Sequence, residues 1–170
     1  MSEIPARSYQ KLFPVPVLLI KVPNAEELNK KLLDEIDQIS ATTPNGKPNS
    51  WACDVYTTLT NNNRLHERSG FSDFDSLMRQ GFIQFGRVMG YDFTPADLDV
   101  TQCWVNIYKI GMSQEIHHHP NNIMTGVYYL KAPPNCSEIL FYSPFADTLI
   151  RPNVYVDNEF NTTIASLHPE

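Results

Sequence analysis

The chain has 170 residues, of which 42% are hydrophobic and 19% are charged. This composition is that of an ordinary globular domain, and it excludes disordered, collagen-like and membrane-embedded chains. The net charge of −6 argues against a nucleic-acid partner, since duplex binding depends on clustered Lys and Arg side chains. We expect a single domain over residues 1–170.

The cysteines and the N-terminal segment indicate the cellular compartment of the protein. Cys53, Cys103 and Cys136 are odd in number and form no CxxC motif, so neither a disulfide framework nor a thiolate zinc site is indicated. Residues 1–11 contain no apolar run typical of a signal peptide, and the apolar stretch 15–20 is too short to cross a bilayer. We expect a cytoplasmic protein without a membrane partner.

The first predicted helix lies near residues 25–39. Residues 12–22 before it read as an extended lead-in, because prolines interrupt it. Asn24 stands as a candidate N-cap, with Glu27 three residues further on. Apolar side chains then recur at helical spacing on one side, which predicts an amphipathic helix packed on a sheet: Leu28, Leu32, Ile36 and Ile39.

A second helix is predicted near residues 72–89. It follows a short predicted strand at 51–59 and two polar loops. Ser72 with Asp75 makes a second cap signature, and Gly90 is the expected stop.

From residue 99 onward the chain predicts strands. β-Branched and aromatic residues occur in short runs separated by turn residues, with no helical period. Helices in 12–98 and strands in 99–170 predict an α+β fold, in which the helices buttress one of two facing antiparallel sheets. The strands are expected at 100–109, 114–119, 123–131, 138–143, 153–157 and 161–167.

Three consecutive histidines, His117 to His119, carry the candidate chemistry. Side chains alternate faces along an extended strand, so His117 and His119 point the same way and His118 points away. Two imidazoles on one face are a bidentate platform for a divalent first-row metal. The alternative is a solvated polar run at a strand end. The preceding strand favours the platform, because one of its faces alternates aromatic and amide side chains: Gln102, Trp104, Asn106 and Tyr108.

The motifs around these histidines resemble a known family. The Y-x-x-G of Tyr108 to Gly111, followed by the H-x-H, is similar to the pattern of prolyl-hydroxylase-like 2-oxoglutarate oxygenases. More narrowly, the chain resembles a bacterial and phage group of 2-oxoglutarate/Fe(II) oxygenases that has H-x-H in place of H-x-D. That likeness covers about residues 101–144 and rests on Trp104–Ile107, His117–Pro120 and Gly126–Tyr129.

The resemblance implies a fold, a cofactor and an activity. The fold is a double-stranded β-helix (a cupin-like jelly-roll), and the activity is that of an Fe(II)- and 2-oxoglutarate-dependent dioxygenase, a hydroxylase of an unknown small-molecule or protein substrate. His117 and His119 fall on the first two iron ligands. Tyr108 and Tyr129 fall where the family binds 2-oxoglutarate, and Asn106 is a further candidate for that pocket. Taken without the resemblance, each tyrosine is equally a half-buried core aromatic.

The C-terminal region departs from the family pattern. The family continues with a distal His as third ligand and an Arg that pairs with 2-oxoglutarate, and both His168 and Arg151 precede those positions. We therefore expect a truncated β-helix, whose open sheet edge invites pairing into a homodimer. Two alternatives stay open: a cupin-like metal protein that does not use 2-oxoglutarate, and a non-catalytic jelly-roll with a structural or binding role.

Overall fold

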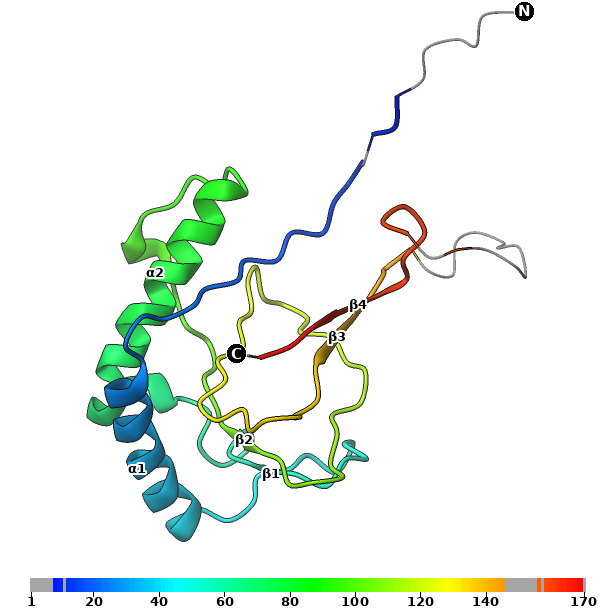
Figure 1. Cartoon of the computed structure of the whole chain (residues 1–170). Helices are drawn as coiled ribbons and strands as arrows, with labels where there is room; N and C mark the ends of the chain where they lie inside the picture. The colour runs from blue at the N-terminus through cyan, green and yellow to red at the C-terminus, as the bar shows by residue number, and fades with distance from the viewer. Residues whose placement is uncertain (1–7, 11, 146–155, 157, 170) are drawn as a thin grey trace, which may run out of the picture. The chain divides into compact units, whose positions relative to one another are not determined.

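The computed structural model describes residues 8–10, 12–145, 156 and 158–169 (Figure 1). The chain forms two compact units, one of residues 20–131 and one of residues 1–19 with 132–170. No helix in the described part of the chain is long and apolar enough to span a membrane. Each unit has its own small sheet, and both long helices belong to the first, so the α+β class is confirmed.

Helix α1 (Glu26–Thr42) confirms the first predicted helix, but its start differs from the prediction. The N-cap position is held by Ala25, and no side chain caps the helix. Asn24 has a φ of 52°, in the left-handed region that Asn tolerates, whereas a capping residue needs an extended backbone. Glu26 and Glu27 still place negative charge on the first turn, which favours the helix dipole.

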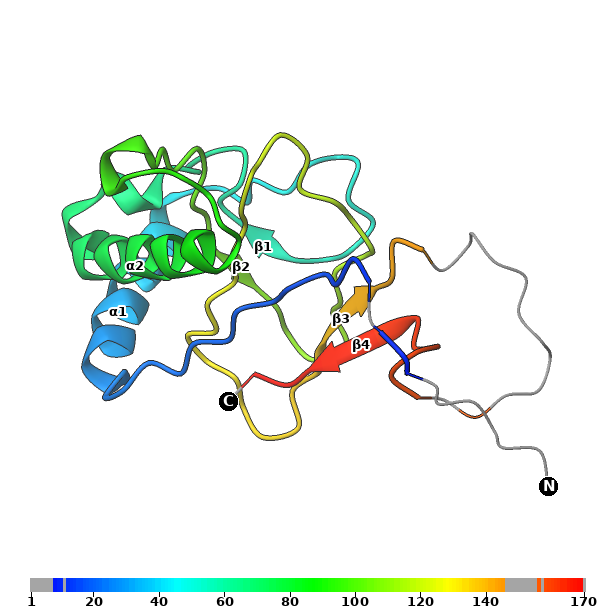
Figure 2. The same cartoon turned by 90° about the horizontal axis from the view of Figure 1, so that it is seen from above.

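Helix α2 (Ser72–Val88) confirms the second predicted helix and lies beside α1 (Figure 2). Two short 3-10 turns, η1 (Leu65–Glu67) and η2 (Ser69–Phe71), lead into it, and a third, η3 (Pro95–Asp97), follows it. The predicted cap at Ser72 is wrong, because Phe71 holds the N-cap position and Ser72 is already helical. The predicted stop is confirmed, since Gly90 has a φ of 71°, which glycine adopts without strain.

The core of this first unit lies on the inner face of α1. Its buried side chains are Leu32, Ile36, Ile39, Leu65 and Phe71. Burying each of them contributes about 1.5–3 kcal/mol relative to exposure. The strand-like segments of the unit present alternate side chains to this core, namely Cys103, Val105, Ile107, Tyr128 and Leu130.

Two contacts hold residues 123–131 to the helices. The Tyr128 hydroxyl donates a hydrogen bond to Asn29 Oδ1 of α1 at 2.7 Å. The Tyr128 ring also packs on Phe74 of α2, with ring centroids 5.3 Å apart. These contacts turn the neighbouring side chains of the segment away from the helices.

The sheet of the first unit is short. Strand β1 (Tyr56–Thr57) pairs antiparallel with β2 (Asn106–Ile107), with Tyr56 opposite Ile107. Both strands are much shorter than the predictions at 51–59 and 100–109. The backbone around β2 bonds to a loop rather than to a continuing strand, because Cys103 N donates to Asn63 O at 2.7 Å.

The second unit contains a two-stranded antiparallel sheet. Strand β3 (Ile139–Tyr142) pairs with β4 (Ile164–Leu167), and Ile139 lies opposite Leu167. These strands confirm the predictions at 138–143 and 161–167. In both views they lie side by side (Figures 1 and 2).

The predicted pair of facing sheets is not present among the described residues. Residues 114–119 and 123–131 are neither helical nor part of a ladder, which corrects the two strands predicted there. A strand requires a neighbour for its backbone groups. These segments instead run near solvent, since Ile116, Ile123 and Val127 are 67%, 82% and 65% exposed. The strand predicted at 153–157 falls outside the described residues, apart from Val156.

Candidate metal centre

The imidazoles of His117 and His119 converge. Their Nε2 atoms lie 3.2 Å apart, and the ring centroids are 4.9 Å apart with planes inclined at 65°. The side chain of His118 is exposed. The alternation of side chains in an extended segment therefore brings the first and third histidines together, as the sequence predicts, although the segment has no ladder.

A backbone carbonyl selects the tautomer of His117. Its Nδ1 lies 2.8 Å from the carbonyl oxygen of Glu115. A carbonyl only accepts hydrogen bonds, so Nδ1 carries the proton and Nε2 keeps a lone pair. Imidazoles that bind metals are commonly oriented in this way by a backbone carbonyl.

The spacing of the two nitrogens fits one metal ion. With imidazole–metal bonds of about 2.1 Å, two nitrogens 3.2 Å apart subtend an angle of about 100° at the ion. That angle suits neighbouring positions of an octahedral or tetrahedral ion. Within the described residues no group of three His, Cys, Asp or Glu side chains assembles, so no third ligand is assigned. His168 Nε2 lies 2.7 Å from Glu138 Oε2, and Arg151 is outside the described residues.

The surroundings of His119 favour its neutral form. Burial, followed by the charge of His117, lowers the pKa of His119 below its usual range. The Trp104 ring stacks near it, with centroids 6.0 Å apart and planes inclined at 29°. A neutral imidazole is the form that binds a metal.

Tyr108 and Asn106 extend the same face. The Tyr108 hydroxyl accepts from Asn106 Nδ2 at 3.2 Å and donates to Gln114 Oε1 at 2.9 Å. Burial raises the pKa of Tyr108, so its hydroxyl stays protonated as a donor. Asn106 Oδ1 is buried without a hydrogen-bond partner, a situation that costs about 1–3 kcal/mol unless a ligand supplies a donor.

Tyr129 is 40% exposed and follows Tyr128, which faces the helices. Burial is the main cause that raises the pKa of Tyr108, and the Tyr129 phenol adds a smaller contribution, so the two phenols lie in one neighbourhood. The structure thus gathers the sequence-predicted site residues into two groups, the imidazole pair and the phenols.

Two polar residues of this region, Gln114 and Glu115, carried no functional prediction. Gln114 and Glu115 bind the loop at Ala52 and Cys53, through Ala52 N to Glu115 Oε1 at 3.0 Å and Cys53 Sγ to Gln114 Oε1 at 3.6 Å. The available signal was the position of Gln114 and Glu115 shortly before the histidine run, from which Ile116 separates them. Their partners lie more than 60 residues earlier in the chain, and no motif marks them.

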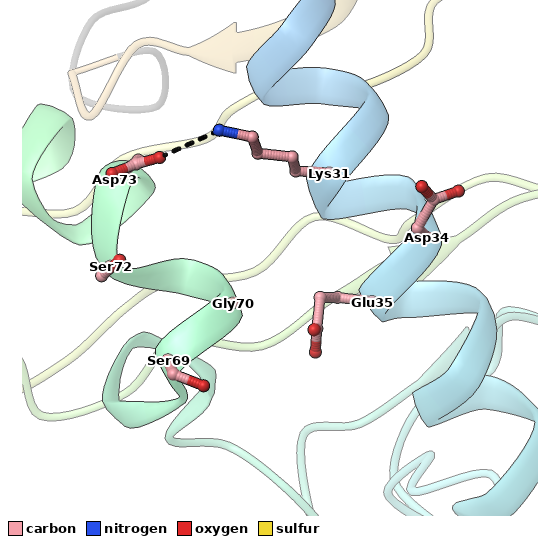
Figure 3. Close-up of a pocket in the computed structure, with 7 residues that line it drawn as sticks. All are labelled: Lys31, Asp34, Glu35, Ser69, Gly70, Ser72 and Asp73. Atoms are coloured by element: carbon pink, nitrogen blue, oxygen red, sulfur yellow. Dashed lines mark ion pairs between the residues drawn. The ribbon is translucent and has the colours of Figure 1, made fainter.

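A hollow of about 400 Å³ lies elsewhere in the first unit, between α1 and the start of α2 (Figure 3). Lys31 Nζ lies 3.7 Å from Asp73 Oδ2 across it, and charges of both signs are present. None of the imidazole or phenol groups lines it. Its lining residues are Lys31, Asp34, Glu35, Ser69, Gly70, Ser72 and Asp73.

Two converging imidazoles are a donor pair that suits a divalent first-row metal ion. Comparison with known families is more specific. Residues 102–170 match the family described as "Putative 2OG-Fe(II) oxygenase". The matched segment contains the histidines, both tyrosines and Asn106. The family also implies the double-stranded β-helix. No curated protein and no solved structure matches the chain.

Proposed function

We propose that the protein is a 2-oxoglutarate- and Fe(II)-dependent dioxygenase that hydroxylates a small molecule or a protein. The observation that carries the proposal is the 3.2 Å approach of His117 Nε2 and His119 Nε2 within the family-matched segment. Neither the substrate nor the reaction product is specified by these residues, because substrate recognition in such folds depends on variable loops.

Each side chain has a distinct role in this proposal. His117 and His119 hold the iron through their Nε2 lone pairs. Bound iron supplies the activation of dioxygen, coupled to decarboxylation of 2-oxoglutarate. Tyr108 and Tyr129 donate hydroxyl hydrogen bonds to the 2-oxoglutarate carboxylates, and Asn106 contributes its amide to the same pocket. Binding a carboxylate requires the Tyr108 proton to turn away from Gln114 Oε1, its present acceptor.

The remaining expectations are part of the same proposal. Residues 1–170 act as one cytoplasmic domain, in which 12–98 supports the first part of a double-stranded β-helix at 99–170. The net charge of −6 supports the absence of a nucleic-acid partner. We also propose that sheet-edge pairing joins two copies of the chain, because unpaired edge groups bind a further strand readily.

A cupin-like metal protein without 2-oxoglutarate is a second candidate. It is favoured by the bond from Tyr108 to Gln114, which already occupies the hydroxyl proton that a carboxylate would need. The two candidates differ in one measurable property. Only the oxygenase should bind 2-oxoglutarate in a metal-dependent manner.

The test uses Co²⁺ as an oxygen-stable substitute for Fe(II), titrated calorimetrically with and without 2-oxoglutarate. Wild-type protein should bind the ion, and 2-oxoglutarate should tighten that binding. The His117→Ala and His119→Ala variants should each lose binding, whereas the matched control His118→Ala should retain it. Tyr108→Phe should keep the metal and weaken 2-oxoglutarate by about tenfold, since a hydrogen bond to a charged group is removed.

Equal Co²⁺ affinity in wild type and the His117→Ala/His119→Ala double variant would refute the metal site. Metal binding that is unaffected by 2-oxoglutarate would favour the cupin-like candidate. If neither the wild type nor any variant binds metal, the remaining candidate is a non-catalytic jelly-roll with a structural or binding role.

A further inference from the structure

Glu115 holds three hydrogen bonds beside the imidazole pair. Its Oε1 accepts from Ala52 N at 3.0 Å, and its Oε2 accepts from Gln114 Nε2 at 3.1 Å. Its backbone oxygen accepts from His117 Nδ1 at 2.8 Å. One residue therefore connects a distant loop to the ring that offers the first metal-binding nitrogen.

Gln114 extends these contacts to the phenol side of the site. Its Oε1 accepts from the Tyr108 hydroxyl at 2.9 Å and from the Cys53 thiol at 3.6 Å. The carboxylate of Glu115 in turn orients the Gln114 amide, because its Oε2 binds the NH₂ group. The amide oxygen is thereby presented to Tyr108.

These side-chain hydrogen bonds hold residues 114–119 in place, because no backbone ladder fixes this segment in the described part of the chain. Two hydrogen bonds tie this segment to a distant part of the chain, the loop at Ala52 and Cys53, 63 and 61 residues away.

We propose that Glu115 is a positioning residue of the metal centre. By anchoring its own segment to Ala52, it keeps its carbonyl against His117 Nδ1. That contact maintains the Nδ1–H tautomer and directs the Nε2 lone pair toward His119. The metal-affinity part rests on the proposed function, whereas the tautomer part concerns the metal-free protein and is independent of it.

The chain offers graded variants for a test. Glu115→Ala removes the carboxylate, and with it the bonds to Ala52 N and Gln114 Nε2. Glu115→Gln keeps an oxygen for Ala52 N but turns an NH₂ group toward the NH₂ group of Gln114. Glu67→Ala is the matched control, because Glu67 also anchors a turn through its carboxylate, to Arg64 at 2.7 Å, without a contact to the imidazoles.

The first measurement is the tautomer of His117 by long-range ¹H–¹⁵N correlation in metal-free protein at pH 8. Wild type and Glu67→Ala should show the Nδ1–H form. Glu115→Ala should show a mixture with the Nε2–H form, and Glu115→Gln should lie between. The second measurement is Co²⁺ affinity, which should fall about tenfold or more in Glu115→Ala, as is typical when an outer partner of a ligand is lost.

A Glu115→Ala protein that keeps the wild-type tautomer and the wild-type Co²⁺ affinity would overturn the inference while leaving the proposed function intact. A tautomer change in a protein whose wild type binds no Co²⁺ would uphold the positioning role and refute the metal function. If Glu115→Ala does not fold, the tautomer of His117 and the Co²⁺ affinity are compared between wild type, Gln114→Ala and Glu115→Gln. Unchanged tautomers in both would then refute the inference.

Discussion

The affinity of His117 and His119 for a metal should depend steeply on pH. An imidazole binds only after it has lost its proton, so each protonated ring lowers the apparent affinity about tenfold per pH unit. Where both rings are protonated, two protons must leave and the fall approaches about 100-fold per unit. Burial and the charge of His117 lower the pKa of His119, so the contribution of His119 begins below the usual range for histidine.

The assay is a Co²⁺ titration followed by visible absorbance from pH 5.0 to 7.5 at constant ionic strength. Wild type and His118→Ala should share one profile, in which affinity falls with falling pH and falls more steeply once His119 is also protonated. In His119→Ala, the affinity of any residual Co²⁺ binding should change by at most about tenfold per pH unit, because only one ring can then be protonated. A dissociation constant that is equal at pH 5.5 and 7.5 would refute the assignment of the imidazoles as ligands.

Two further predictions concern the first unit. In α2 a Cβ on Gly86 would lie 2.3 Å from the Phe93 ring, so we expect Gly86→Ala to destabilise the fold by about 1–2 kcal/mol in urea denaturation despite its better helix propensity. Gly81→Ala in the same helix should be nearly neutral, because its Cβ would meet the end of the Ile20 side chain at 3.0 Å, which can shift. A Phe93→Ala background that leaves the cost of Gly86→Ala unchanged would contradict the clash. Burial raises the pKa of Cys103 to about 11. Its alkylation by iodoacetamide at pH 8, measured by peptide mass spectrometry, should therefore be about 100-fold slower than that of an unperturbed thiol, and equal rates would contradict the burial.

The two helices were predictable because their apolar period is local. Leu32, Ile36 and Ile39 define one stripe, and that stripe is what the structure buries. The caps were not predictable from the same residues. A cap depends on the backbone angle of a single residue, and Asn24 takes a left-handed conformation on the path into α1.

The division of faces along residues 103–108 was also predictable. Alternation alone places Val105 and Ile107 on the face opposite Trp104, Asn106 and Tyr108, and both pack against the core under α1. The lengths of the strands were not. Ladder formation depends on a partner that is distant in sequence, and around β2 the partner is an irregular loop rather than a regular strand.

At the candidate metal centre, one feature follows from the local sequence and another depends on a distant partner. The convergence of His117 and His119 follows from their i, i+2 spacing, and it survives without a ladder because the alternation is a property of the extended backbone itself. The choice of nitrogen that faces the partner ring does not follow from spacing. It follows from the Glu115 carbonyl, whose place is set by a bond to Ala52, 63 residues away. A substitution that disturbs the bond from Ala52 N to Glu115 should therefore alter the tautomer of His117. The side chains of His117 and His119 should still lie on one face of the segment, because that depends only on their i, i+2 positions.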